Sequence, residues 1–400
     1  MSLFDSVIDR APVSRKIGQM KQMFGTEDII PLWIADMDFK TPQAILTELA
    51  TVLSQPVQGY NMDYPGWKES VIHWYQKRYN CLLNEEWLHF IPGVIKTVAL
   101  SLLALTEPGD NILTFTPVYD PYRNLVPGSY RHLLQSPLIE NNGTYSINWD
   151  DFREKLKKSK LFLFVSPHNP GGVVWDKETL LKIKRFCHEE GVIVISDEVH
   201  CDLTLTDKKH IPFFNIDDDM ENQSVVLHST GKTFNTPGIQ GGFMIIKNRQ
   251  LRDKLYRFLD RCHLAETHYL QQSAIFSAYT YCDDWYQELR VYLAENVNFL
   301  KQSIERYCPK ISVIYGGASY LLFLNAEKLG LDDEELASFF IKDAQLGLSP
   351  GLQYGPGGEK HMRINVGCPR SVLVQAMENL KSAYSTLSVW QSKAAPALNV

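Results

Sequence analysis

Long apolar runs are missing from this sequence of 400 residues. The longest, at 161–165 and 192–195, are far too short to cross a bilayer. The first 16 residues carry acidic side chains and no uninterrupted apolar core, so they do not predict a signal peptide. Neither charge sign forms a long block, since 40 Lys and Arg stand against 46 Asp and Glu for a net charge of −6. We expect a cytoplasmic protein that binds small molecules and other copies of itself, with no nucleic acid or membrane as partner.

Cysteine pairs are absent as well. The seven cysteines are an odd number, none forms a Cys-x-x-Cys pair, and most lie in apolar or helical surroundings. Buried reduced thiols in a reducing compartment are therefore expected, and no metal site is predicted. The chain also lacks internal repeats, and its length with 44% apolar residues predicts a large core divided over two domains.

Short apolar runs do occur, and between about 90 and 285 they alternate with helical patterns. The runs that predict strands lie at 111–115, 161–165, 192–196 and 225–229. They lack polar alternation, which is typical of parallel strands covered on both faces. Apolar side chains at helical spacing occupy 94–103 and 177–190. We predict an α/β fold with a mostly parallel central sheet and helices on both faces.

The rest of the chain predicts a smaller α/β domain. After about residue 286 come a long amphipathic helix, an apolar segment at 311–325, a helix near 333–345 and the run HMRINV at 361–366. Apolar and polar side chains alternate in HMRINV, as in a strand with one polar face. The predicted division is 1–40, an N-terminal segment packing with the small domain; 41–285, the large domain; and 286–400, the small domain.

Three polar segments follow strands of the predicted sheet: Ser166–Gly172, Asp197–His200 and Ser229–Lys232. Ligands of parallel sheets bind beyond the carboxyl ends of the strands, so these segments are expected to line one crevice. Alone, Ser-x-x-Lys is typical of a surface lysine beside a capping serine. Over a crevice, a partly desolvated lysine has a depressed pKa and acts as a nucleophile toward carbonyls. Lys232 is therefore the first candidate for chemistry.

Asp197 and Asn169 each have two interpretations. Asp197 is either an N-cap at a strand-to-helix turn or a carboxylate that keeps a pyridinium nitrogen protonated. Glu198 suits the second role less well because Asp197 lies nearer the sheet. Asn169 opens an Asn-Pro-Gly-Gly turn, and that turn can also aim its amide at a phenolate oxygen. For Asn169 the two interpretations hold together.

Five motifs in a fixed order resemble a known family. They are TPVY (116–119), HNPGG (168–172), SDEVH (196–200), STGK (229–232) and MRINVG (362–367). Over nearly the whole chain they resemble the aminotransferase class I/II superfamily of pyridoxal 5′-phosphate (PLP) enzymes, fold type I. Within it, PLWIADMDF (31–39), PHNPGGVVW (167–175), SDEVHCDL (196–203) and INVGCPR (364–370) resemble the carbon–sulfur β-lyases. These are the cystathionine β-lyases and cysteine desulfhydrases of the maltose-regulon-modulator type.

The resemblance implies a role for each matching residue around the cofactor ring. Lys232 would carry PLP as a Schiff base, Asp197 would pair with the pyridine nitrogen, and Asn169 would donate to the ring hydroxyl. Tyr119 would stack on the ring face. A core or loop aromatic is the open alternative for it, because the chain has 19 tyrosines.

The resemblance also implies contacts at the two ends of the site. The backbone of Val94 and Ile95 at a helix start, with the Ser229 hydroxyl, would hold the phosphate, since a helix N-terminus offers free amides to an anion. Arg363 would bind the substrate carboxylate with its planar fork, and its alternative is a solvent-facing arginine on a half-buried strand. Tyr60 would reach the site of a neighbouring subunit, which implies a homodimer.

Three positions depart from the pattern of transaminases. Gly231 stands where many relatives have a phosphate-binding serine, and Gln240 stands where transaminases usually have an arginine for the same phosphate. Fewer phosphate contacts and looser binding are expected. His200 stands where many transaminases have a tyrosine that contacts the ring oxygen, and histidine there favours the lyases. A structural histidine is the alternative.

The resemblance leads to a function with two alternatives. The primary expectation is α,β-elimination from L-cystathionine, L-cysteine or S-substituted cysteines, giving pyruvate, ammonia and a thiol or hydrogen sulfide. The same core residues also serve an aminotransferase. A third possibility is a regulatory binding protein with a secondary lyase activity.

Overall fold

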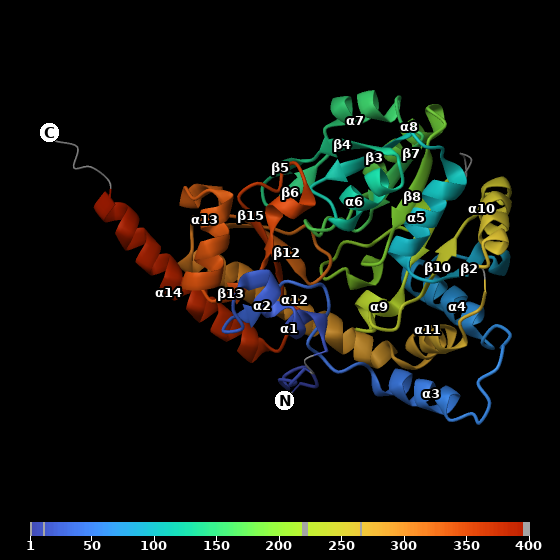
Figure 1. The fold of residues 1–400 in the computed structure, drawn as a ribbon, viewed down its shortest axis with the longest axis horizontal. Coiled ribbons are helices and arrows are strands. Elements are labelled where there is room, and N and C mark those ends of the chain that lie inside the picture. Colours follow the sequence, from blue (N-terminus) through green and yellow to red (C-terminus); the bar gives the residue numbers. More distant parts are fainter. Residues whose placement is uncertain (1, 11–12, 218–222, 265, 395–400) are drawn as a thin grey trace.

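The computed structural model describes residues 2–10, 13–217, 223–264 and 266–394. Its largest sheet has seven strands with helices on both faces (Figure 1). In spatial order these are β2 (Leu88–Ile91), β10 (Gly242–Ile245), β9 (Ser224–His228), β8 (Ile193–Asp197), β7 (Leu161–Val165), β3 (Asn111–Thr116) and β4 (His132–Pro137). Pairing is parallel from β9 to β4, whereas β10 runs antiparallel to both β9 and β2. The predicted α/β fold with a mostly parallel sheet is confirmed.

The uninterrupted apolar strands arise because each face of the sheet meets its own core. In β7, Phe162 and Phe164 belong to one core, whereas Leu161 and Leu163 belong to the other. The first core packs against α3 (Gln43–Leu53), α4 (Trp67–Tyr79), α7 (Trp149–Leu156), α8 (Lys177–Glu189) and α11 (Tyr269–Tyr281). The second packs against α5 (Val94–Leu105), α6 (Pro121–Gly128) and α10 (Arg249–Arg261). A strand buried on both faces has no place for polar side chains.

A smaller antiparallel sheet carries the third core. Its strands are, in order, β11 (Ser312–Ile314), β12 (Leu321–Asn325), β15 (His361–Asn365) and β14 (Ser349–Pro350). Around it lie α12 (Asp283–Tyr307), α13 (Asp333–Ser338) and α14 (Arg370–Ala394) (Figure 1). The remaining elements are α1 (Arg15–Gly18), α2 (Met20–Phe24), α9 (Thr230–Thr233), β1 (Ile30–Pro31), β5 (Ile139–Asn141), β6 (Thr144–Ser146) and β13 (Leu346–Gly347). No helix in the described ranges is both long and apolar enough to cross a membrane.

The N-terminal segment packs with this smaller sheet. β1 pairs in parallel with β13, and Phe4 and Leu32 belong to the same apolar core as Leu322. The boundary predicted at residue 286 falls inside α12. In that helix Tyr286 packs in the core of the large sheet and Leu289 in the core of the small one, so one helix joins the two.

Two sequence patterns differ in detail from the elements they predict. The helix expected near 333–345 ends at Ser338 and continues as a wider π turn over Phe339–Asp343. In HMRINV the alternation does not separate core from solvent, because all five residues of β15 are buried. The polar side chains of this strand instead face the protein interior. Buried thiols are as predicted: no disulfide joins the seven cysteines, which all lie within the described ranges, and all but the exposed Cys262 are buried.

The turn after β7 is clamped against the small sheet. The backbone amides of Gly316 and Ala318 donate to the carbonyl oxygens of Gly171 and Gly172, each at 2.9 Å. Gly172 has a φ of +62°, and a methyl group added there would lie 2.5 Å from the Ala318 carbonyl oxygen. Only glycine satisfies both the backbone angle and the close approach.

Gly172→Ala is expected to destabilise the protein more than Gly191→Ala. Gly191 has a similar φ of +66° with nothing within 4 Å of an added methyl, so it supplies the backbone cost alone, about 1–2 kcal/mol. Overpacking at Gly172 should add about 1–3 kcal/mol. Urea unfolding midpoints of the two variants test this, and equal midpoints would show that the clamp yields without cost.

Candidate functional site

Three strand ends bring the predicted residues to one edge of the large sheet. Asp197 is the last residue of β8, Asn169 lies in the turn after β7, and Lys232 lies in α9, directly after β9. Since β7, β8 and β9 are adjacent and parallel, their carboxyl ends meet there. The three polar segments that were expected to line one crevice therefore do meet at one edge of the sheet.

The Lys232 amine lies under the N-terminal segment. Its Nζ atom donates a hydrogen bond of 2.6 Å to the Ala35 carbonyl oxygen. Burial lowers the pKa of Lys232 to about 8, and the positive charge of Arg363 acts in the same direction, whereas Asp36 and Asp197 oppose it. A substantial neutral fraction near pH 8 makes this amine a nucleophile and a base.

Asp197 is a buried carboxylate that forms no ion pair within the described ranges, and only 4% of it is exposed. The Tyr122 hydroxyl donates to Oδ2, and the Val199 amide donates to Oδ1 at 3.2 Å. Burial raises the pKa of Asp197, and these hydrogen bonds partly offset the shift. The side chain thus caps the following turn and also presents a charge that a protonated ring nitrogen would stabilise. Both interpretations of Asp197 fit the geometry.

Glu198 turns away from this edge. Its oxygens accept hydrogen bonds from Ser196 Oγ at 2.8 Å and from the Phe213 amide at 2.9 Å, and His210 Nε2 lies 2.8 Å from Oε2. The carboxylate is therefore engaged in fixing the chain behind the site.

Arg363 comes to the site from β15 and is buried, so it is not the solvent-facing arginine of the alternative interpretation. Its Nη1 donates to Asn169 Oδ1 at 3.3 Å and its Nη2 to the Trp33 carbonyl oxygen at 2.9 Å. Its Nε is buried and has no hydrogen-bond partner among the residues that the structure describes. A buried guanidinium with an unused donor fits a carboxylate ligand.

His200 and Tyr119 lie in the segments that follow β8 and β3. His200 is buried, and its Nδ1 lies 3.1 Å from Ser319 Oγ. Burial, with the charges of Lys232 and Arg363, lowers the pKa of His200 well below 6.5, so the ring is neutral. Tyr119 is half-buried and packs edge-on against Tyr122, with ring centroids 5.8 Å apart.

The helix start expected to hold a phosphate is open. α5 begins at Val94 after Gly93, and no side chain in the described part of the chain caps its first turn, which leaves the amides of Val94 and Ile95 free of such a capping oxygen. Ser229 already caps α9: its Oγ accepts from the Gly231 amide at 3.1 Å and donates to the Gly241 carbonyl oxygen at 2.8 Å.

Tyr60 alone stands apart from the set. It is fully exposed in the segment that links α3 to α4, whereas the other predicted residues are buried or half-buried. A single chain therefore does not bring Tyr60 into the site.

Sequence reasoning missed two supports of the site. The carbonyl oxygens of Trp33 and Ala35 accept hydrogen bonds from Arg363 and Lys232. Both residues lie in PLWIADMDF, which was used above only as evidence of the family resemblance. Behind Lys232, Asp202 accepts a hydrogen bond from Thr233 at 3.0 Å and lies 3.3 Å from His228 Nε2.

Asp202 is a fixed anion of the interior. Burial acts to raise its pKa, but His228 and hydrogen bonds from Tyr79 and Trp74 outweigh burial and lower it. Because Thr233 follows Lys232, the carboxylate anchors the turn that carries the amine. In the sequence, the only sign of Asp202 was an acidic residue within SDEVHCDL.

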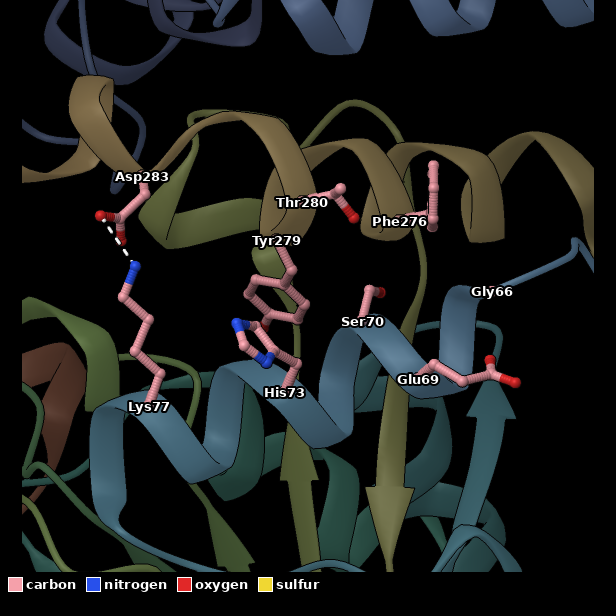
Figure 2. Close-up of a pocket in the computed structure, with 9 residues that line it drawn as sticks. All are labelled: Gly66, Glu69, Ser70, His73, Lys77, Phe276, Tyr279, Thr280 and Asp283. Carbon is pink, nitrogen blue, oxygen red and sulfur yellow. Dashed lines mark ion pairs between the residues drawn. The ribbon is translucent and has the colours of Figure 1, made fainter.

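A separate hollow of about 370 Å³ lies between α4 and α11 (Figure 2). Its lining includes the ion pair of Lys77 and Asp283 and the aromatic rings of Phe276 and Tyr279. None of the predicted site residues lines it. The hollow is therefore distinct from the edge where Lys232 lies.

Comparison with known proteins identifies the family. Residues 27–380 match the family model described as aminotransferase class I and II. Cystathionine beta-lyase PatB of Bacillus subtilis is 38% identical over 366 residues, which cover 91% of this chain and 95% of that protein. The chain belongs to the aminotransferase class I and II family.

Two solved structures are similar over the whole chain. Cystalysin from Treponema denticola, which contains a pyridoxal 5′-phosphate cofactor, matches with a TM-score of 0.91 and 28% identity, over 96% of this chain and 99% of that one. The PLP-bound C–S lyase from Staphylococcus hominis matches with a TM-score of 0.88 and 30% identity, over 95% and 98%. The resemblance to the carbon–sulfur lyases is confirmed.

Lys232 is expected to react with aldehydes at lower pH than an ordinary lysine. Because the neutral amine attacks and its pKa is about 8, the rate should rise with pH through about 8 and then level off. Borohydride trapping of pyridoxal on cofactor-free protein, with peptide mass spectrometry, measures this rate. Arg363→Met should move the midpoint upward by removing a positive charge. A rate that climbs until about pH 10.4, as for an exposed lysine, would contradict the assignment.

Proposed function

We propose that this family member is a carbon–sulfur β-lyase that performs α,β-elimination on L-cystathionine, L-cysteine or S-substituted cysteines. Its cofactor is pyridoxal 5′-phosphate, which its solved relatives contain. The products are pyruvate, ammonia and a thiol or hydrogen sulfide. The observation that carries the proposal is the meeting of a desolvated lysine, a buried unpaired carboxylate and a buried arginine with an unused donor. The names of the similar proteins support the sulfur chemistry.

PLP, when bound, supplies a ring that accepts the electron pair released at the substrate Cα. The buried carboxylate of Asp197 stabilises the protonated ring nitrogen that this chemistry requires. Asn169, held by Arg363, lies in the turn that would face the ring hydroxyl. These two residues supply charge and orientation and do not themselves exchange a covalent bond.

Lys232 and Arg363 would handle the substrate. Arg363 orients the substrate carboxylate, and Lys232, with a pKa of about 8, is suited to take the Cα proton as a base. The Cβ–S bond then breaks, and sulfur leaves with the bonding electrons. Hydrolysis of the remaining three-carbon unit gives pyruvate and ammonia. His200 is buried and neutral. It therefore adds no positive charge that would lower the pKa of Lys232.

An aminotransferase is the second candidate, favoured by the name of the family itself. The same residues also suit transamination, because removal of the Cα proton is common to both reactions. The two differ in whether an acceptor keto acid is needed.

Purified protein given L-cystathionine or an S-substituted cysteine, and no keto acid, is expected to release pyruvate and thiol in equal amounts, whereas L-cysteine should give pyruvate and hydrogen sulfide. Lactate-dehydrogenase-coupled pyruvate detection and thiol titration measure the two products. Lys232→Ala should abolish both, as the matched control. Product that forms only after a keto acid is added would identify an aminotransferase instead.

We also propose that the enzyme is a homodimer in which Tyr60 completes the site of the partner subunit. Tyr60 is fully exposed, and Val57 and Met62 beside it are 77% and 86% exposed. Apolar side chains gathered on one exposed segment favour burial against another protein surface. A second copy of this chain would cover the segment and bring the Tyr60 hydroxyl to a site that lacks it.

Mixing two inactive variants is expected to restore activity if Tyr60 acts across subunits. Tyr60→Ala and Lys232→Ala each disable every site of their own dimers, but a hybrid dimer has one site with both residues intact. Random exchange should recover about a quarter of the wild-type activity. Pyruvate release after co-refolding measures it, and analytical ultracentrifugation reports the oligomeric state. A mixture as inactive as its components would show that Tyr60 does not act in the partner's site.

A further inference from the structure

We propose that Lys96 supplies the positive charge for the cofactor phosphate at the place where Gln240 stands instead of an arginine. The proposal rests on the proposed function, since it takes PLP as the ligand. It revises the expectation of looser phosphate binding that followed from Gln240 alone.

The sheet brings the two residues together. β2 and β10 are antiparallel neighbours, with Gly242 opposite Ile91. The chain leaving β2 therefore enters α5 at the same edge where the chain containing Gln240 enters β10. Across this gap Lys96 Nζ donates a hydrogen bond of 2.7 Å to Gln240 Oε1.

This contact lies at the phosphate end of the site. Gly241, next to Gln240, accepts the hydrogen bond of the Ser229 hydroxyl, and Ser229 caps the turn that bears Lys232. Lys96 is the third residue of α5, directly after Val94 and Ile95. The free amides, the serine and the Lys96–Gln240 pair therefore lie in segments that leave or enter neighbouring strands at the same end of the sheet.

Lys96 carries its positive charge at the end of α5 that is already partly positive. A helix N-terminus carries a partial positive charge, so a lysine in the first turn is unfavourable unless an anion lies nearby. The first turn of α5 contains no acidic residue, and no carboxylate in the described ranges forms an ion pair with Lys96. Within the described ranges its hydrogen-bond partner is the neutral amide oxygen of Gln240. An excess of positive charge with no counter-ion fits a dianionic phosphate.

Lysine is suited to this role as a compact charge with three donors. One donor is used by Gln240, which holds the ammonium group at the mouth of the helix, and two remain. Gln240 is therefore a positioning residue in this arrangement, where an arginine would have contacted the phosphate itself.

The test compares binding of PLP with binding of pyridoxal, which lacks the phosphate. In Lys96→Met, the dissociation constant for PLP should rise about tenfold, the scale of a lost charged hydrogen bond, while that for pyridoxal stays unchanged. Gln240→Arg added to Lys96→Met should restore PLP binding. Lys254→Met, at an exposed position of α10, is the matched control and should leave both constants unaltered. Absorbance titration of cofactor-free protein measures all of these.

Equal weakening of PLP and pyridoxal binding, or unchanged PLP binding in Lys96→Met, would overturn the role of Lys96. Failure of the proposed function gives a different result, because wild-type protein would then take up neither compound. Restoration by Gln240→Arg distinguishes a phosphate contact from a general loss of folding.

Discussion

The site depends on keeping one amine out of water. Lys232 is covered by the N-terminal segment, and its hydrogen bond to the Ala35 carbonyl oxygen replaces solvent. Water would hold the amine protonated, whereas burial beside Arg363 shifts it toward the neutral form. The parallel order of β8 and β9 places a carboxylate at the neighbouring strand end without neutralising the arginine. Asp197 and Lys232 thus meet at the carboxyl ends of neighbouring strands, and the charge of Arg363 acts on Lys232 from β15.

Three acids within one short segment have separate tasks. Asp197 faces the site, Glu198 is tied to His210 and Phe213, and Asp202 anchors Thr233 beside Lys232. One lies at the strand end and two lie after it, so their side chains point in different directions. Each of the three carboxylates has its own hydrogen-bond donors, which offset the repulsion among the buried acids.

Much of this arrangement was predictable from residue patterns. Unbroken apolar runs indicated strands covered on both faces, and the segments after them contained Lys232, Asp197 and Asn169. The contacts of Arg363 were not predictable, because they depend on how β15 packs against a loop 330 residues away in the chain. Alternation in HMRINV indicated a strand, but period alone does not distinguish a face toward solvent from a face toward a polar interior. The pairing of Lys96 with Gln240 was not predictable either, because the two residues are 144 positions apart in the chain.

The N-terminal segment also determines when the site can form during synthesis. Residues 33–36 are held by Asn365, whose amide nitrogen donates to the carbonyl oxygens of Ile34 and Asp36, and β1 has its strand partner at β13. A nascent chain therefore carries this segment from the start, whereas its partners Asn365 and β13 are made only near the end of synthesis. The cover over Lys232 thus joins the two ends of the chain.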